Sequence, residues 1–252
     1  MAAKDIPQAS KKQVDGFCQK LTKEAEQLVA VFFPQKIEDL QTLMKSATCC
    51  VDLESLKAPL DIPMPDPVKD EAKAKKKKEE AKAKKAKEGK KDKDSDDEED
   101  AEPRAPICIN GRVQSLLQEV KPQIHTLKEK LNTVSMWMQL QIPKIEDGNN
   151  FGVAVQEKVF EVLTSNRTKI EGFQTQISKY YSERGDAVAK ASKSPHVGDY
   201  RQLVHELDQY QYFELRLVLQ DICNTYAVLF DVITKNYDKI KKPRGDGKAL
   251  IY

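Results

Sequence analysis

Apolar residues recur every three or four positions through the middle of the chain, a spacing that places them on one face of a helix. The longest series alternates steps of four and three without a break: Val113, Leu117, Val120, Ile124, Leu127, Leu131, Val134 and Met138. Such a seam indicates a helix that packs lengthwise against other helices. We predict a helix over 107–142 that bends at Pro122, because proline cannot donate its backbone hydrogen bond there.

Two further helices are predicted after residue 150. The first covers 153–184, where Asn166 interrupts an apolar face formed by Val155, Val159, Val162, Ile170, Phe173, Ile177 and Tyr180. The second, over 199–241, is expected to be the longest, with stripes formed by Leu203, Leu207 and Tyr210, then Leu215, Leu219, Ile222, Tyr226, Leu229 and Ile233. Apolar residues outside these stripes favour subunit contacts, since a four-helix monomer buries one face per helix. They are Leu217, Val218, Val228 and Phe230, and a broader core within one chain is the alternative.

A less regular apolar series predicts another helix over 10–46, kinked at Pro34. We therefore expect a single all-α domain over 1–252, an up-and-down four-helix bundle with an insert over 57–104 between the first two helices. The insert begins proline-rich, and its 69–102 part holds 13 lysines, 13 acidic residues and otherwise only Ala, Gly and Ser. Such a segment has nothing to bury, so we predict a disordered, solvated loop; a specific interaction motif is the alternative.

Charge balance and cysteine usage narrow the function classes. Lys and Arg number 42 and Asp and Glu 40, a net charge of +2, so we expect no nucleic-acid partner. No continuous apolar run approaches the roughly 20 residues that cross a bilayer, so we expect no membrane partner. The five cysteines form no CxxC pair, and the first residues lack the apolar core of a signal peptide. An odd number of cysteines without a secretion signal favours a reducing compartment, the cytosol or the nucleus.

Catalytic motifs are absent from the sequence. An enzyme needs a nucleophile, a base and stabilising donors that converge on one pocket. The three histidines, His125, His196 and His205, belong to no HExxH, GxSxG or Walker-type motif. Cys49 and Cys50 are adjacent, which is poor geometry for binding one metal together. We therefore expect a protein that is not an enzyme, with no catalytic residues, no metal site and no cofactor.

The connection between the second and third helices is longer than helix connections usually are. It carries two glycines, two adjacent asparagines and two acids in the run Lys144, Ile145, Glu146, Asp147, Gly148, Asn149, Asn150, Phe151 and Gly152. Gly and Asn tolerate positive φ and form tight turns, so we predict a loop of defined shape. A shaped polar loop at the end of a bundle is a candidate contact surface, with plain connection as the alternative.

The last residues form a second candidate contact segment. A basic helix end is followed by breakers at 243–247, and the chain finishes Lys248, Ala249, Leu250, Ile251 and Tyr252. Three apolar residues with a free carboxylate suit insertion into a pocket that offers apolar contacts and a cation or backbone donors. A frayed terminus is the alternative interpretation of the same residues.

Several segments together resemble alpha-type members of the 11S proteasome activator (REG) family. The resemblance covers all four predicted helices. It is carried by residues 58–63, 139–143, 145–155, 176–180, 182–186 and 195–200 and by the Ile251–Tyr252 end. The charged insert fits the so-called KEKE loop of alpha-type members, although here it is alanine-rich and ends in an acidic block. That departure leaves the function of the insert open.

The resemblance implies a heptameric ring that caps the alpha ring of the 20S proteasome core particle and opens its gate to peptides without ATP. It also implies a cytoplasmic protein that acts in antigen-peptide processing. The ring would contain this chain alone or together with a homologous beta subunit. Carried onto this sequence, 144–152 is the activation loop, with Asn149 central and Asp147, Gly148 and Asn150 shaping the turn. The 243–252 segment is the docking tail, anchored by Leu250, Ile251 and the Tyr252 carboxylate.

Two other classes of function compete with this interpretation. A coiled-coil scaffold or adaptor would recruit its partners through the charged insert, and its activity would depend on 69–102. A basic helical nucleic-acid binder is supported only by the lysines of 73–93 and would bind in a salt-sensitive way.

Overall fold

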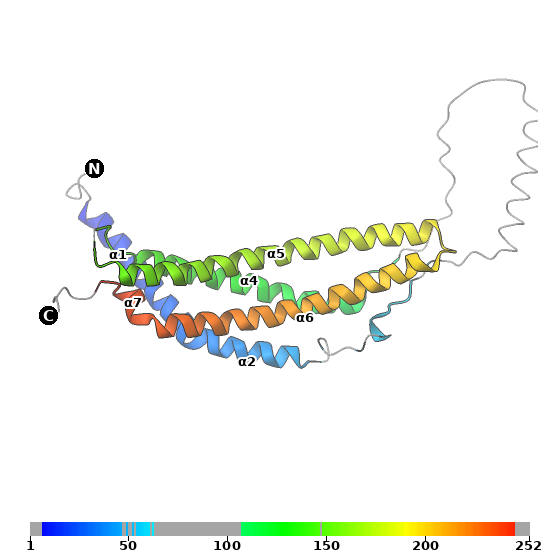
Figure 1. The fold of residues 1–252 in the computed structure, drawn as a ribbon, viewed down its shortest axis with the longest axis horizontal. Helices are drawn as coiled ribbons and strands as arrows, with labels where there is room; N and C mark the ends of the chain where they lie inside the picture. Colours follow the sequence, from blue (N-terminus) through cyan, green and yellow to red (C-terminus); the bar gives the residue numbers. More distant parts are fainter. Residues whose placement is uncertain are drawn as a thin grey trace, which may run out of the picture.

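The computed structural model describes residues 7–46, 49, 52, 54–60, 62, 107–146 and 148–244. These residues form helices and no strand: α1 (Gln8–Gln27), a π-helical turn η2 (Leu28–Phe32), α2 (Phe33–Met44), a 3-10 turn η3 (Glu54–Leu56), α4 (Gly111–Leu140), α5 (Phe151–Lys193), α6 (Gly198–Lys235) and α7 (Tyr237–Lys241). The long helices lie side by side and run up and down, as predicted (Figure 1). Apart from 57–60 and 62, the predicted insert lies outside the described residues.

The apolar seam of the second predicted helix lies in the core. All eight seam residues are buried in α4, together with Leu116 and Trp137. The helix continues through Pro122, whose side chain is exposed. Asn110 caps the start of α4: its side-chain oxygen accepts hydrogen bonds from the backbone N–H groups of Arg112 (3.0 Å) and Val113 (3.3 Å).

The first predicted helix is interrupted just before Pro34. The backbone N–H of Phe33 donates to the carbonyl of Leu28, five residues back, which widens the helix by one residue at η2. Proline has no N–H and its ring crowds the preceding turn, so the wider turn accommodates it. The chain changes direction between α1 and α2, as the kink prediction requires (Figure 1).

The third helix is longer than predicted. We expected it to end at Arg184, but α5 continues through Gly185 to Lys193 and, with 43 residues, exceeds the 38 of α6. Gly185 has open space around its Cα, so it costs only its intrinsic helix penalty of about 1 kcal/mol. Burial of Ala187 and Ala191 beyond it outweighs that cost, and the helix ends at Lys193 with Ser194 as its C-cap.

The fourth helix also departs from its predicted pattern. It breaks at Asn236, which separates α6 from the short α7. Between Gly198 and Tyr212, Leu203 and Tyr210 are exposed and the buried residues are Val204, Asp208, Gln211 and Tyr212. The surplus apolar residues divide between the two alternatives: Val218 is buried and Phe230 packs on the core, while Leu217 and Val228 are exposed.

A buried carboxylate explains the altered pattern. Asp208 accepts hydrogen bonds from Tyr180 Oη (2.7 Å), Arg184 Nε (2.7 Å) and Asn110 Nδ2 (2.9 Å), which joins α6 to α5 and α4. Burial and this carboxylate raise the pKa of Tyr180, so the phenol stays a donor. A buried charge persists only when it is paired and hydrogen-bonded, and here both conditions hold.

By length and composition alone, α6 is apolar enough to cross a membrane. Its contacts point elsewhere, because it packs against α2, α4 and α5. Its apolar residues from Leu215 to Ile233 lie largely in the core that these helices share. The apolar character of α6 is therefore that of a core helix.

Candidate functional site

Three chain segments meet at one end of the bundle, where α4 ends, α5 begins and α7 ends (Figure 1). Gln156 joins them, because its Nε2 donates to the carbonyls of Gln141 (3.0 Å) and Ile240 (2.7 Å). The last carbonyls of a helix have no partner within the helix, so one amide supplies a donor to a carbonyl at each of two helix ends. The 144–152 loop and the start of the carboxyl-terminal tail (243–252) therefore leave the bundle from neighbouring positions.

Arg244 joins the tail directly to the loop. Its Nη1 donates to the carbonyl of Lys144 (2.6 Å) and to Glu146 Oε2 (3.0 Å). Its Nη2 donates to Asn150 Oδ1 (3.0 Å) and, more weakly, to the carbonyl of Glu146 (3.4 Å). The planar guanidinium suits such a multiple contact, because it holds its donors in a fixed fork. One side chain thus contacts the loop on both sides of its turn.

A second contact places the tail against the start of α5. A Cβ added at Gly152 would collide with the backbone oxygen and carbon of Pro243. Only glycine allows the two backbones to approach this closely. The requirement for glycine at 152 is therefore set by the tail, not by a turn in the loop.

The turn of the loop has the backbone conformation that its composition favours. Gly148 has φ of 82° and Asn149 has φ of 47°, both in the left-handed region. Asp147, which we predicted to shape the turn with them, lies outside the described residues. Asn149 and Asn150 are exposed, and the apolar side chains of Ile145 and Phe151 are 94% and 74% exposed. The loop therefore exposes polar and apolar side chains to solvent, while the hydrogen bonds from Arg244 hold its backbone in place.

The short helix α7 is itself fixed to α1. Glu26 Oε1 accepts hydrogen bonds from Tyr237 Oη (2.6 Å) and from Lys241 Nζ (2.8 Å). The Lys241 ammonium and then the Tyr237 hydroxyl hold the pKa of Glu26 below its ordinary value of 4.5. Trp137 of α4 stacks on the Tyr237 ring, with centroids 6.4 Å apart. These contacts fix the point from which the tail departs.

The predicted docking residues Lys248, Ala249, Leu250, Ile251 and Tyr252 lie outside the described residues. The sequence marks the loop and the tail as candidates. It does not reveal the roles of Arg244 and Gln156, which join the two segments, or of Glu26, which fixes α7 to α1. Arg244 follows a proline in a breaker segment, and no periodicity marks its partners. The two adjacent asparagines and Gly152 are the available signals, and on their own they indicate only a loop.

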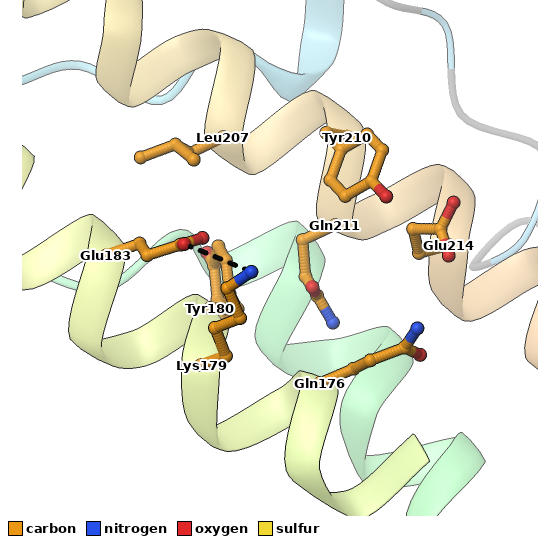
Figure 2. Close-up of a pocket in the computed structure, with 8 residues that line it drawn as sticks. All are labelled: Gln176, Lys179, Tyr180, Glu183, Leu207, Tyr210, Gln211 and Glu214. Atoms are coloured by element: carbon orange, nitrogen blue, oxygen red, sulfur yellow. Dashed lines mark ion pairs between the residues drawn. The ribbon is translucent and has the colours of Figure 1, made fainter. Parts of the chain in front are cut away.

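A separate pocket of about 120 Å³ lies between α5 and α6 (Figure 2). It is lined by Gln176, Lys179, Tyr180, Glu183, Leu207, Tyr210, Gln211 and Glu214. Gln176 lies 24 residues after Gly152, or roughly 36 Å along α5 at 1.5 Å per residue. The lining contains an ion pair between Lys179 and Glu183 (3.5 Å) but no Cys, His or Ser. Lys179 and Glu183 are both exposed, so their contact is an ordinary surface ion pair.

Comparison with known proteins agrees with this geometry. The family model described as proteasome activator PA28, C-terminal, matches residues 106–249, and that described as proteasome activator PA28, N-terminal, matches residues 8–67. Human proteasome activator complex subunit 2 is 46% identical over 244 residues, which cover 96% of this chain and 95% of that protein. Human proteasome activator complex subunit 3 is 37% identical over 248 residues, 98% of each chain.

Solved structures share the fold. The 11S subunit of the Plasmodium falciparum proteasome, PA28, superposes with a TM-score of 0.74 at 23% identity, covering 95% of this chain and 97% of that one. A chain in the structure of an archaebacterial 20S proteasome–PA26 complex gives a TM-score of 0.62 at 13% identity, covering 98% and 100%. At such identities the likeness concerns the fold, while the two family models and the human relatives carry the assignment. The chain belongs to the proteasome activator PA28 family.

Proposed function

We propose that this protein forms a ring that docks on the alpha ring of the 20S proteasome core particle and opens its gate to peptides without ATP. The observation that carries the proposal is the contact of Arg244 with Lys144, Glu146 and Asn150. This contact places the 144–152 loop and the start of the tail (243–244, the tail root) at the same end of the bundle. One partner surface can then engage both. Membership of the PA28 family and the names of its human relatives support the choice of partner.

The mechanism divides docking from gate opening. Leu250, Ile251 and the Tyr252 carboxylate anchor each tail weakly, and a ring presents several tails at once, so multivalency produces stable docking. The docked 144–152 loops then contact the open gate better than the closed one and shift its population. Asn149, at the tip of the turn, is the central contact residue of each loop. The protein acts as a regulator, and the peptide bonds are cleaved by the core particle.

Exposed apolar side chains on the outer face of α6 support ring assembly. Leu217 and Val228 are 57% and 47% exposed. A groove beside Leu217 is lined by Gln41, Met44, Lys45, Phe213, Arg216 and Gln220. Such surface is suited to burial against another subunit. We propose a heptamer, made of this chain alone or with a homologous beta subunit.

The proposal includes a cytoplasmic location: the cysteine count favours a reducing compartment, and the resemblance to alpha-type members favours the cytosol over the nucleus. A role in antigen-peptide processing rests on the resemblance to alpha-type members of the family. Neither nucleic acid nor a membrane is among the proposed partners. The scaffold function remains the second candidate, with the charged insert as its recruiting segment.

A peptidase assay tests the proposal directly. The purified protein is added to latent core particles, and cleavage of a short fluorogenic peptide is followed without ATP. The intact chain should stimulate cleavage, and a chain truncated after Ala249 should not. If the intact chain gives no stimulation either alone or with a beta subunit, the proposed function is wrong. Loss of activity on deletion of 69–102, with the truncation harmless, would support the scaffold function.

A further inference from the structure

We propose that Arg244 is the positioning residue that makes the docking tail and the 144–152 loop one unit, so that docking of the tail sets the place of the loop. The inference rests on the proposed function and adds the residue that couples the docking tail to the activation loop. Arg244 belongs to the tail by sequence, and all of its described side-chain contacts are with the loop. We assign it no contact with the core particle.

The contacts of Arg244 span the turn that carries Asn149. Lys144 and Glu146 lie before the turn and Asn150 lies after it, so one guanidinium holds both sides of the loop. The Asn150 amide adds a contact across the same turn, because its Nδ2 lies 3.5 Å from the Glu146 carbonyl. Without Arg244, these loop groups would lose the donor that they share.

The environment of Arg244 strengthens its contacts. Its side chain is only 18% exposed, whereas Glu146 is 53% exposed. A hydrogen bond between charged groups is stronger than one between neutral groups, and partial burial limits its screening by water and salt. The other cation near Glu146, Lys144 Nζ, lies 3.9 Å from Oε1 and its side chain is 86% exposed. Arg244 is therefore the dominant cation for this carboxylate among the described residues.

The chain between Arg244 and the docking residues is short. Tyr252 lies eight residues after Arg244, and eight residues span at most about 29 Å even when fully extended. The backbone of Pro243 also packs on Gly152, so the tail root cannot shift without moving the start of α5. A tail seated in its pocket thus keeps the loop within reach of that pocket.

The test separates binding from activation. Arg244→Ala removes the hydrogen bonds from the Arg244 side chain to the loop but leaves the sequence of 245–252 unchanged. The half-saturating concentration for core particles should stay within about twofold of the parent protein, while maximal stimulation of peptide cleavage falls about tenfold. Arg244→Lys keeps the charge but not the fork, so its stimulation should be intermediate. Lys242→Ala, at an exposed lysine two residues earlier, is the matched control and should change neither quantity.

Hydrogen exchange in the free protein supplies a second readout. Backbone amides of 144–150 should exchange faster in Arg244→Ala than in the parent, while those of the α4 core stay protected. Asn150→Ala should lower stimulation less than Arg244→Ala, and the double variant should be no worse than Arg244→Ala alone, because both changes remove the same contact.

The outcomes distinguish the two levels of the proposal. If the parent protein stimulates and Arg244→Ala stimulates equally, the positioning role is wrong and the proposed function stands. The positioning role is also wrong if Arg244→Ala loses binding in proportion to activity. If the parent itself fails to stimulate, with and without a beta subunit, the proposed function fails first and the positioning role fails with it.

Discussion

At the end of the loop, the backbones of Gly152 and Pro243 lie so close together that residue 152 has room only for the hydrogen atom of a glycine. Gly152 lies in the first turn of α5, where glycine would ordinarily be a poor choice for a helix. The carbonyl of Pro243 occupies the space that a Cβ would take. The close approach keeps Arg244 within reach of the loop, so the cost of glycine in the helix is offset by the placement of the tail.

This arrangement predicts opposite effects for two helical glycines. Gly152→Ala should destabilise the protein by about 1–3 kcal/mol, because the clash is with backbone and outweighs the helix-propensity gain of alanine. Gly172→Ala, at an exposed site with open space around it, should stabilise by up to about 1 kcal/mol. Urea unfolding at one fixed protein concentration measures both. Stabilisation by both substitutions would show that Pro243 moves aside freely.

Whole helices were predictable where their buried residues are apolar. The seam of α4 was predicted correctly because all eight of its residues are both apolar and buried. The first half of α6 was not, because Asp208 and Gln211 are buried polar residues, which a hydrophobic pattern assigns to the surface. The end of α5 was misplaced for a related reason: Gly185 is a breaker in sequence, yet the tertiary contacts of Ala187 and Ala191 carry the helix past it.

The candidate site was predictable only as two separate segments. Turn chemistry predicted the tight turn at 148–150, where Gly148 and Asn149 have positive φ. The apolar end marked the tail as a candidate, and its docking residues lie outside the described part of the chain. The contacts that join them are polar and long-range, from Arg244 back to Lys144, Glu146 and Asn150, and local sequence rules carry no information about such pairs. The same holds for Glu26, whose partners Tyr237 and Lys241 lie in a helix at the other end of the sequence.

The attachment of α7 to α1 should depend on pH. The pKa of Glu26 is lowered in the folded state by Lys241 and Tyr237, so its contribution to stability is fully present above its ordinary value of 4.5 and is lost as the pH falls through the lowered value. The contribution is small, below about 1 kcal/mol, because the pair is partly exposed.

Hydrogen exchange of 237–242 measures this attachment. At pH 7, Glu26→Gln should raise the exchange of these amides relative to the parent. Near pH 3, once intrinsic exchange rates are allowed for, the difference between the two proteins should shrink. Glu24→Gln, which changes an exposed acid on the same helix, is the control and should behave as the parent at both pH values. A difference that persists unchanged at low pH would contradict the role of the Glu26 charge.

The molecule as a whole separates its two unusual segments. The loop and the tail root lie where α4 and α7 end, while the chain leaves the described fold at Ile62 and returns at Ile107 near the other end of the bundle (Figure 1). Arg201 Nη2 donates to the carbonyl of Ile62 (3.0 Å) there, and Arg184 Nη2 to that of Cys108 (3.4 Å). If the protein docks through the end that carries the loop, the insert is attached at the opposite end. Deletion of 69–102 should therefore leave an activator functional but inactivate a scaffold that recruits through the insert.

The last prediction concerns the tip of the loop, where backbone and side chain make separate contributions. Asn149 is exposed with φ of 47°, which a bulky side chain adopts at a cost of about 1–2 kcal/mol. Asn149→Phe should keep ring assembly and core-particle binding, because the tail is unchanged, but lose stimulation. Asn149→Gly keeps the turn and removes only the side chain. Full stimulation by the glycine variant would assign the role of residue 149 to backbone shape, and loss would assign it to the amide. If Asn149→Phe fails to assemble or to bind, the division between docking tail and activating loop is wrong.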